Sequence, residues 1–326
     1  MSIKHVIAVF LLATFSIIQI KAQEEIVYDQ YYFNYYLVNP AVAGAERCTH
    51  FMLTGKFQWV GLKDAPMTQT LSFRTRILNN VGIGAYVYND KNGYSYRQGG
   101  EVSFAYHIPL SEGTRYMMKD RAIERQLSFG VSAKLQHYNF SSDLYTYENS
   151  YDPTLANGGK DKGFYFNANF GVYFIWDDIF AGLSATNLVP SKMSEFGPGE
   201  PVPPFMGFGF VGYDINLTDE MAIEPAVMFK MNQDMNKQLD INLKFLQSEL
   251  PNNEDFSYWI QVCYRQGLDN GNMQALSLSP MGGIRFGGFH IAYAYTLGLT
   301  ALNRHNYGSH EIMLAYTLCQ SKHFCR

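Results

Sequence analysis

Apolar and polar residues alternate with a period of two along most of the chain. Over 127–136, five apolar residues at odd positions alternate with five polar or small residues at even positions. A strand places such alternate side chains on opposite faces, whereas a helix would mix the two sets on every face. The same alternation recurs over 240–245, 289–295 and 311–318. The pattern therefore predicts β-strands with one apolar and one polar face.

Turn residues separate these runs, and the strand and turn rules together predict about 14 strands. Their typical length is about ten residues, which a tilted strand needs to cross a bilayer, whereas soluble strands usually have about five or six. The predicted spans are 49–59, 67–75, 81–88, 96–107, 126–138, 163–176, 179–186, 205–215, 221–231, 239–246, 256–265, 274–286, 289–296 and 310–318. The expected fold is all-β, a transmembrane antiparallel β-barrel of the outer-membrane type. A soluble β-sandwich is the alternative.

The predicted connections agree with a barrel whose two ends lie in the periplasm. An even strand number leaves both ends on one side, where turns are short, while long loops lie outside. The short set is 78–80, 177–178, 216–220 and 287–288, and the long set includes 139–162, 187–204 and 297–309. The connection 108–125 breaks this rule and 247–255 bends it. We expect additional periplasmic structure at 108–125, such as a docking surface.

Composition supports a membrane barrel. Aromatic residues make up 16% of the 326 residues, with 24 Tyr and 24 Phe, which suits aromatic belts at two membrane–water boundaries. The net charge is −4 with both signs well mixed, unlike the clustered basic face of a nucleic-acid-binding protein. We therefore expect contact with outer-membrane lipid and none with nucleic acid.

The first 22 residues have the features of a secretory signal peptide. Lys4 gives a positive start, residues 6–20 are largely apolar, and residues 20–22 resemble a cleavage site. The mature chain would then begin near Gln23. An uncleaved N-terminal membrane anchor is the alternative. Beyond residue 22, the sequence has no run of about 18 apolar residues that would predict a transmembrane helix.

The polar strand faces carry charges of both signs. On the lipid side each Lys or Arg would cost about 2–4 kcal/mol at mid-depth, so these faces should line the lumen. The charged residues are Lys56, Arg74, Glu101, Lys134, Glu224, Lys230, Asp240, Lys244, Arg265 and Glu311. Mixed signs favour a salt-bridged interior over a channel selective for one sign.

A stretch of polar and aromatic residues precedes the first strand. It could fold into the lumen or cover the periplasmic mouth. The predicted division of the chain is a signal peptide at 1–22, an N-terminal periplasmic or plug segment at 23–48, the β-barrel at 49–318 and a periplasmic C-terminal tail at 319–326.

Four cysteines occur, without the spacing of a zinc site. Closing a barrel pairs the first strand with the last, which brings Cys48 close to the C-terminal end of the chain. We therefore predict a disulfide from Cys48 to Cys319 or Cys325 that staples this seam. Free thiols are the alternative.

Patterns of catalysis are missing from the sequence. No nucleophile elbow, phosphate loop or HExxH pattern occurs, and the i, i+5 spacing of His305 and His310 does not suit a metal. Residues 90–93 are better explained as a turn than as a calcium loop. We predict no enzyme, cofactor or metal site, although an embedded hydrolase pairing a Ser or an acid with a His at one rim stays an alternative.

A series of short motifs runs through the mature chain in a fixed order. The motifs are NPAVAG at 39–44, QWVG at 58–61, APMTQTLS at 65–72, YNDK at 88–91, AYHIPL at 105–110 and SHEIML at 309–314. Each motif alone is weak, but the ordered set resembles the PorP/SprF family of Bacteroidota outer-membrane proteins. The long 108–125 connection and the cysteine-bearing C-terminus depart from that pattern.

The resemblance implies a part in the type IX secretion system and, in some members, in gliding motility. It implies partners among the components of that machine and an exported protein with a C-terminal sorting domain. The motif residues are Asn39, Pro40, Ala41, Gly44, Trp59, Gly61, Pro66, Gln69, Asn89, Asp90, Pro109, His310 and Glu311. We interpret these residues as structural, with Asn39-Pro40 as a rigid corner before the first strand and Trp59 at a membrane interface. A porin-like channel or transporter is the alternative function.

Overall fold

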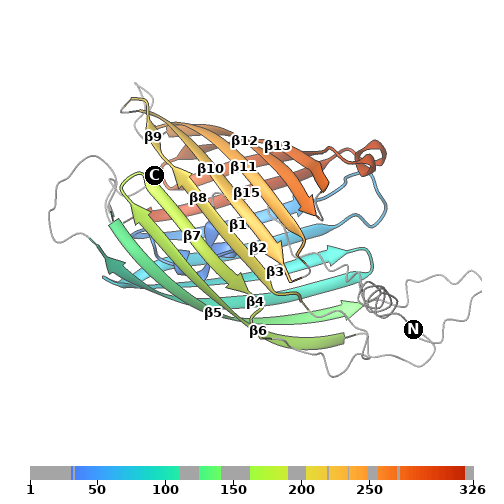
Figure 1. Ribbon diagram of the computed structural model, residues 1–326, viewed down its shortest axis with the longest axis horizontal. Helices are drawn as coiled ribbons and strands as arrows, with labels where there is room; N and C mark the ends of the chain where they lie inside the picture. Colours follow the sequence, from blue (N-terminus) through green and yellow to red (C-terminus); the bar gives the residue numbers. More distant parts are fainter. Residues whose placement is uncertain are drawn as a thin grey trace, which may run out of the picture.

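The structure is a computed structural model that describes residues 31, 34–110, 125–140, 162–189, 203–218, 220–233, 235–248, 256–269 and 272–319. These residues form a closed antiparallel β-barrel (Figure 1). Each strand pairs with the next along the chain, and the first strand pairs with the last, so the sheet closes into a ring. The predicted antiparallel barrel is confirmed.

The strands are β1 (Cys48–Phe57), β2 (Met67–Leu78), β3 (Val81–Asn92), β4 (Ser95–Pro109), β5 (Arg125–Phe140), β6 (Lys162–Trp176), β7 (Ile179–Thr186), β8 (Met206–Tyr213), β9 (Ile215–Asn216), β10 (Met221–Asn232), β11 (Lys237–Gln247), β12 (Phe256–Asp269), β13 (Asn272–Phe286), β14 (Phe289–Gly298) and β15 (Ser309–Cys319). β8 and β9 both pair with β10 and act as one interrupted strand, so the described wall has fourteen strand positions, the predicted number. Pro225 lies opposite the interruption and has no N–H to donate to the ladder. β1 and β15 each extend one residue beyond the predicted barrel bounds, because Cys48 pairs with Cys319 in the register.

The barrel has a polar interior and an apolar exterior. On β1, Thr54 and Lys56 are buried in the lumen, whereas Leu53 and Phe57 are 47% and 41% exposed on the outer face. The other strands also place polar side chains in the lumen and apolar side chains on the outer face, as contact of the outer face with lipid requires. Within the described residues, no helix is long and apolar enough to cross a membrane.

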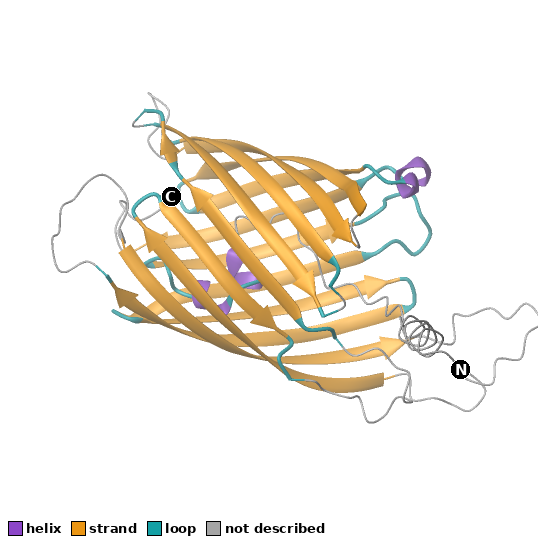
Figure 2. Cartoon of the chain, in the orientation of Figure 1, coloured by secondary structure: helices purple, strands orange, loops and turns teal. Residues whose placement is uncertain are grey.

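The two ends of the barrel differ. One end carries the short turns that join β2 to β3, β6 to β7 and β13 to β14, and β15 finishes there. The opposite end carries several long connections, one of which contains the 3₁₀ helix η4 (Ala301–His305) (Figure 2), together with the short turns from β3 to β4 and from β12 to β13. The connection from Pro109 of β4 to Arg125 of β5 is long but belongs to the short-turn end, as the sequence predicted. Two further 3₁₀ helices, η1 (Tyr35–Leu37) and η2 (Pro40–Val42), lie inside the barrel (Figure 2). The predicted signal peptide, most of the 108–125 connection, and the C-terminal tail with Cys325 lie outside the described residues.

Candidate functional site

Residues 34–46, which we call the lumen plug, cross the interior of the barrel before β1 begins. The plug consists of η1, η2 and the bends that follow them. Asn39, Ala41 and Ala43 have no exposed surface at all. Residues 34–46 therefore lie in the lumen, whereas residues 23–30, 32 and 33 of the predicted N-terminal segment lie outside the described residues.

Asn39 organises the plug through both ends of its side-chain amide. Its backbone is extended, as the following proline requires. Its Oδ1 accepts a hydrogen bond from the Ala41 N–H at 2.9 Å, which caps η2. Its Nδ2 donates to the backbone carbonyls of Val172 at 3.0 Å and Leu183 at 3.4 Å. Asn39-Pro40 thus forms a capped turn that is bonded to the wall at β6 and β7.

Lumen-facing glycines provide the space in which the plug lies. A Cβ added at Gly82 would come within 2.0 Å of the Ala43 carbonyl oxygen. One at Gly130 would come within 2.2 Å of the Ala41 nitrogen, and one at Gly171 within 2.0 Å of the Asn39 Oδ1. Glycine inside a strand often marks such a close backbone approach. We call Gly82, Gly84, Gly130 and Gly171 the glycine recess.

Three wall side chains bind the carbonyl groups at the end of the plug. Arg76 Nε donates to the Gly44 carbonyl at 2.8 Å, and Gln126 Nε2 donates to the Ala45 carbonyl at 3.5 Å. His107 Nε2 lies 3.0 Å from the Ala43 carbonyl oxygen. Because a carbonyl can only accept, that nitrogen carries the proton. These bonds satisfy carbonyls that would otherwise be buried without partners.

Aromatic side chains at the other end of the plug reach across the lumen. Tyr35 stacks on Phe210 of β8 with ring centroids 4.1 Å apart, and the Tyr36 hydroxyl lies 3.0 Å from Ser103 Oγ. Just before the plug, the Tyr31 hydroxyl donates to Asp240 Oδ2 of β11 at 2.9 Å. The chain is therefore bonded to both sides of the barrel wall.

A cavity of about 360 Å³ lies beside the plug, lined by residues of β10 to β15 and β1 and also by residues of β2, β6 and β7. Residues of the short turns line it, among them Asp177 and Asp178, which places it at the short-turn end. Its lining is charged with both signs: acids include Glu46, Asp214 and Glu224, and bases include His50, Arg74, Lys244, Arg285 and His290. Glu224 and Lys244 pair with each other at 3.0 Å.

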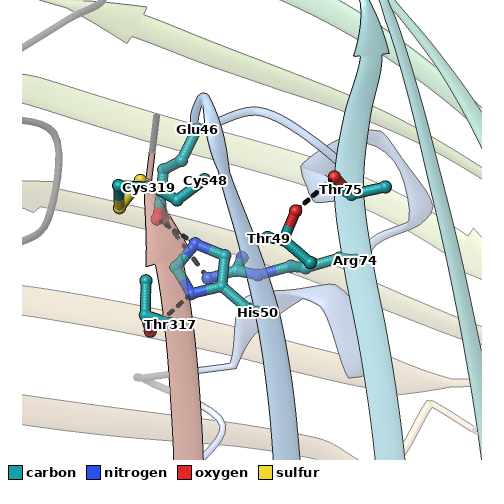
Figure 3. Close-up of a disulfide and its surroundings, with 8 residues drawn as sticks. All are labelled: Glu46, Cys48, Thr49, His50, Arg74, Thr75, Thr317 and Cys319. Carbon is teal, nitrogen blue, oxygen red and sulfur yellow. Dashed lines mark hydrogen bonds and ion pairs between the residues drawn. A yellow bond between two sulfur atoms is a disulfide. The ribbon is translucent and has the colours of Figure 1, made fainter. Parts of the chain in front are cut away.

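The plug ends beside the barrel seam, where the structure joins Cys48 to Cys319 by a disulfide (Figure 3). Glu46, two residues earlier, points at Arg74 and His50 (Figure 3), with contacts of 3.3 Å to Arg74 Nη2 and 2.7 Å to His50 Nε2. Burial alone would raise the pKa of the Glu46 carboxyl. The positive charge of Arg74 and the contact with His50 outweigh it and hold that pKa well below its usual range.

Apart from Pro109, the motif residues outside the plug gather at the long-loop end. Trp59 and Gly61 adopt positive φ angles in the loop after β1, and Gly61 lies against the ring of Tyr307. On the lumen face, Asp90 accepts hydrogen bonds from Thr68 Oγ1 at 2.6 Å and Arg97 Nε at 3.0 Å.

The same two strands pair Asn89 with Gln69 on the outer face, where Asn89 Nδ2 donates to Gln69 Oε1 at 3.4 Å. Pro66 ends the loop, where its carbonyl accepts from the Gln58 N–H at 2.9 Å. The neighbours His310 and Glu311 point to opposite faces. Glu311 is buried opposite Lys56, and His310 contacts the Tyr293 hydroxyl at 2.6 Å.

The structure thus separates the motif residues into two groups rather than one site. Asn39, Pro40, Ala41 and Gly44 belong to the plug, while Pro109 is exposed at the short-turn end of β4. Sequence reasoning did not identify the glycine recess or the side chains that bind the plug carbonyls. The signal for the recess was present, as glycines at lumen-facing positions of three predicted strands. Among the described residues, no group of three or more His, Cys, Asp or Glu side chains could hold a metal ion.

A closed barrel with a polar interior and an apolar outer surface defines the class of outer-membrane β-barrels. The family model for the type IX secretion system membrane protein PorP/SprF matches residues 20–316. The chain belongs to this family, which confirms the resemblance of its motifs. The fold and the family together indicate a membrane protein of the outer membrane that is associated with type IX secretion components.

Solved structures of low sequence identity share the barrel fold. The CymD monoaromatic hydrocarbon channel is 11% identical, with a TM-score of 0.51 over 88% of this chain and 93% of that chain. The toluene transporter TbuX of Ralstonia pickettii is 14% identical, with a TM-score of 0.45 over 87% of this chain and 92% of that chain. No curated protein matches the sequence significantly. At such identities the likeness concerns the fold alone.

Proposed function

We propose that this protein is a plugged barrel that serves the type IX secretion system as an anchor or docking component. Its role would be to anchor or help export a surface protein with a sorting domain, or to dock periplasmic parts of the machine. The observation that carries this proposal is the lumen plug. A segment bonded to β6, β7 and the glycine recess occupies space that a wide pore would need.

In the proposed orientation the short-turn end of the barrel faces the periplasm, and the cavity inside the lumen lies at that end. Bacterial barrels have short turns on that side and long loops outside. Removal of a signal peptide after residue 22 would leave about a dozen residues before the plug. The new N-terminus would then lie on the periplasmic side. N-terminal sequencing of the purified protein should then begin at or near Gln23. A chain that begins at Met1 would contradict this part of the proposal.

The docking role is tested by purifying the tagged protein from its own outer membrane in mild detergent and identifying bound proteins by mass spectrometry. We expect type IX components or one surface protein with a sorting domain. A tagged barrel of another family from the same cells is the control for non-specific capture. A barrel that purifies alone would contradict the anchor function.

A porin-like channel is the second candidate, and the cavity favours it. The space of about 360 Å³ beside the plug is lined in part by charged side chains of both signs. Single-channel recording in planar bilayers separates the two functions. An anchor should be silent because the plug crosses the lumen, whereas steady conductance of the wild-type protein would favour the channel.

A further inference from the structure

Four basic side chains line one side of the cavity. Arg74 lies on β2, His50 on β1, His290 on β14 and Arg285 on β13, and all four line the same space. Cross-strand register places His50 opposite Arg74, and Arg285 opposite His290. We call these four residues the basic band.

Between the two pairs, β15 contributes Thr317. This residue stands opposite His50 in the register, with its Oγ1 3.2 Å from His50 Nδ1. The four basic residues and Thr317 together therefore span five neighbouring strands, β13, β14, β15, β1 and β2, at the short-turn end.

A carboxylate already occupies one end of the basic band. Glu46 of the plug contacts Arg74 Nη2 at 3.3 Å and His50 Nε2 at 2.7 Å (Figure 3). This side chain is half exposed to the cavity rather than enclosed by it. The wall thus has the geometry to hold a carboxylate, and the one that it holds is open to exchange with water or with a ligand.

The other end of the band, beside the Arg285 guanidinium, has an unpartnered ring nitrogen. His290 Nε2 is buried without a hydrogen-bond partner in the described part of the chain, and a buried polar atom left in this way costs free energy. Trp259, Met52 and Met313 line the same cavity and give it an apolar floor. A ligand with a carboxylate next to an apolar group would match both features.

The opposite side of the cavity orients such a ligand. Asp214 and Glu224 lie there on the β8–β9 break and on β10 and repel a carboxylate, although Lys244 neutralises part of that charge. The volume of about 360 Å³ exceeds what a single carboxylate needs, so the cavity also has room for the residues next to the carboxylate in an extended peptide.

We propose that the basic band is a carboxylate-binding site for a ligand that enters the cavity from the short-turn end, with a peptide carboxylate as the best match. Glu46 acts as the internal competitor for this site. The proposal needs only the cavity and its walls, so it stands apart from the secretion role.

The test is a titration of the purified full-length protein in detergent with an N-acetylated apolar pentapeptide that ends in a free carboxylate. Trp259 lines the cavity, so its fluorescence reports binding once Trp59 and Trp176 are changed to Phe. The same peptide with a C-terminal amide is the matched probe. Succinate and inorganic phosphate are titrated separately. We expect the carboxylate peptide to bind about tenfold more tightly than the amide, because hydrogen bonds to a charged group are stronger than those to a neutral one.

Variants test whether the band holds the probe. The double variant Arg285→Gln/His290→Gln should weaken binding by about tenfold or more. Glu46→Gln should tighten binding severalfold, because it removes the competing carboxylate. Arg97→Gln, at the long-loop end, is the control and should leave binding unchanged. Unchanged heat-modifiable migration of every variant on gels shows that the barrel is folded.

Several results would overturn the proposal: equal binding of the amide and the carboxylate peptide, binding that the double variant does not weaken, or phosphate binding as tight as that of any carboxylate. No binding to either the wild type or Glu46→Gln would overturn it too. Succinate that binds as tightly as the peptide would support the site and assign it to free small carboxylates. Tight binding of the peptide alone would assign it to a chain end.

Discussion

The two sides of the lumen wall are built from different residues. The side formed by β2 to β8, which we call the plug wall, carries the glycine recess and is in direct contact with the backbone of the plug. The side formed by β10 to β15 and β1, the cavity wall, presents large side chains to the lumen. Met281, Met313 and Trp259 are buried there. Three members of the basic band, His50, Arg285 and His290, lie on the same side, while the fourth, Arg74, lies on β2 at the edge of the plug wall.

This difference explains how one lumen can hold a tightly packed plug on one side and an unfilled cavity on the other. At Gly82, Gly130 and Gly171 the plug lies so close to the wall that a side chain at any of these positions would occupy the space of the plug, and this close contact favours one conformation of the plug. Charged and flexible side chains leave a volume that water or a ligand can fill. The plug wall therefore has the features of a rigid seat, and the cavity wall those of a binding surface.

The largest effect is expected at the seam that lies within the cavity wall. Changing Cys48 and Cys319 together to Ser removes a link that spans 271 residues, and loss of such a link typically costs about 2–4 kcal/mol, chiefly by freeing the unfolded chain. The free energy of unfolding in urea, measured in lipid vesicles, should fall by this amount. A reducing agent should produce the same fall in the wild type and none in the double variant. A wild-type protein whose cysteines all alkylate without reduction would contradict the bond.

The next prediction compares one glycine from each wall. Gly130→Ala places a Cβ 2.2 Å from the Ala41 nitrogen, so the plug must shift, at a cost of about 1–3 kcal/mol. Gly267→Ala on the cavity wall meets its nearest neighbour at 3.4 Å and should cost less than about 1 kcal/mol. Hydrogen exchange of a peptide covering residues 34–46 should rise in the first variant alone. Equal exchange in both variants would remove the distinction between the walls.

The fold could be predicted because the alternation of residue types is local. Each strand such as 127–136 shows its two faces within a few residues, and turn residues mark its ends. Strand number and connection lengths then limited the topology to a closed barrel with both ends on one side. The interruption at Pro225 was missed, because a two-residue strand produces no periodic signal of its own.

The site could be predicted only in part, because its contacts join residues that are far apart in the sequence. The NPAVAG motif at 39–44 indicates a structural role for these residues and predicts a rigid corner before the first strand. Its partners, Gly130 and Gly171, lie about ninety and one hundred and thirty residues later. Nothing in a single sequence pairs them, although a glycine at a lumen position of a strand is a signal for close approach.

A smaller effect is expected when the plug loses its organising amide. Asn39→Ala removes the cap of η2 and the bonds to two wall carbonyls, while the glycine recess stays intact. The plug should lose about 1–2 kcal/mol of stability, because a lost cap and an unpaired buried carbonyl each cost about 1 kcal/mol. Exchange of residues 34–46 should rise without a change in barrel migration. Asn89→Ala, which removes an exposed bond on the outer face, is the control. Exchange equal to that of the wild type would mean that the recess alone holds the plug.

The smallest effect concerns the contact that joins the plug to the basic band. The pKa of Glu46 is depressed in the folded protein, so its contribution to stability is present above its unfolded pKa of about 4.3 and is lost as the pH falls toward the folded value. Because this carboxylate is half exposed, the contribution should stay below about 1 kcal/mol. Plug exchange, corrected for its intrinsic pH dependence, should be slightly faster in Glu46→Gln than in the wild type at pH 7, and the difference should vanish in acid. A difference that persists in acid would assign the effect to the packing of Glu46 against Arg74 and His50 rather than to its charge.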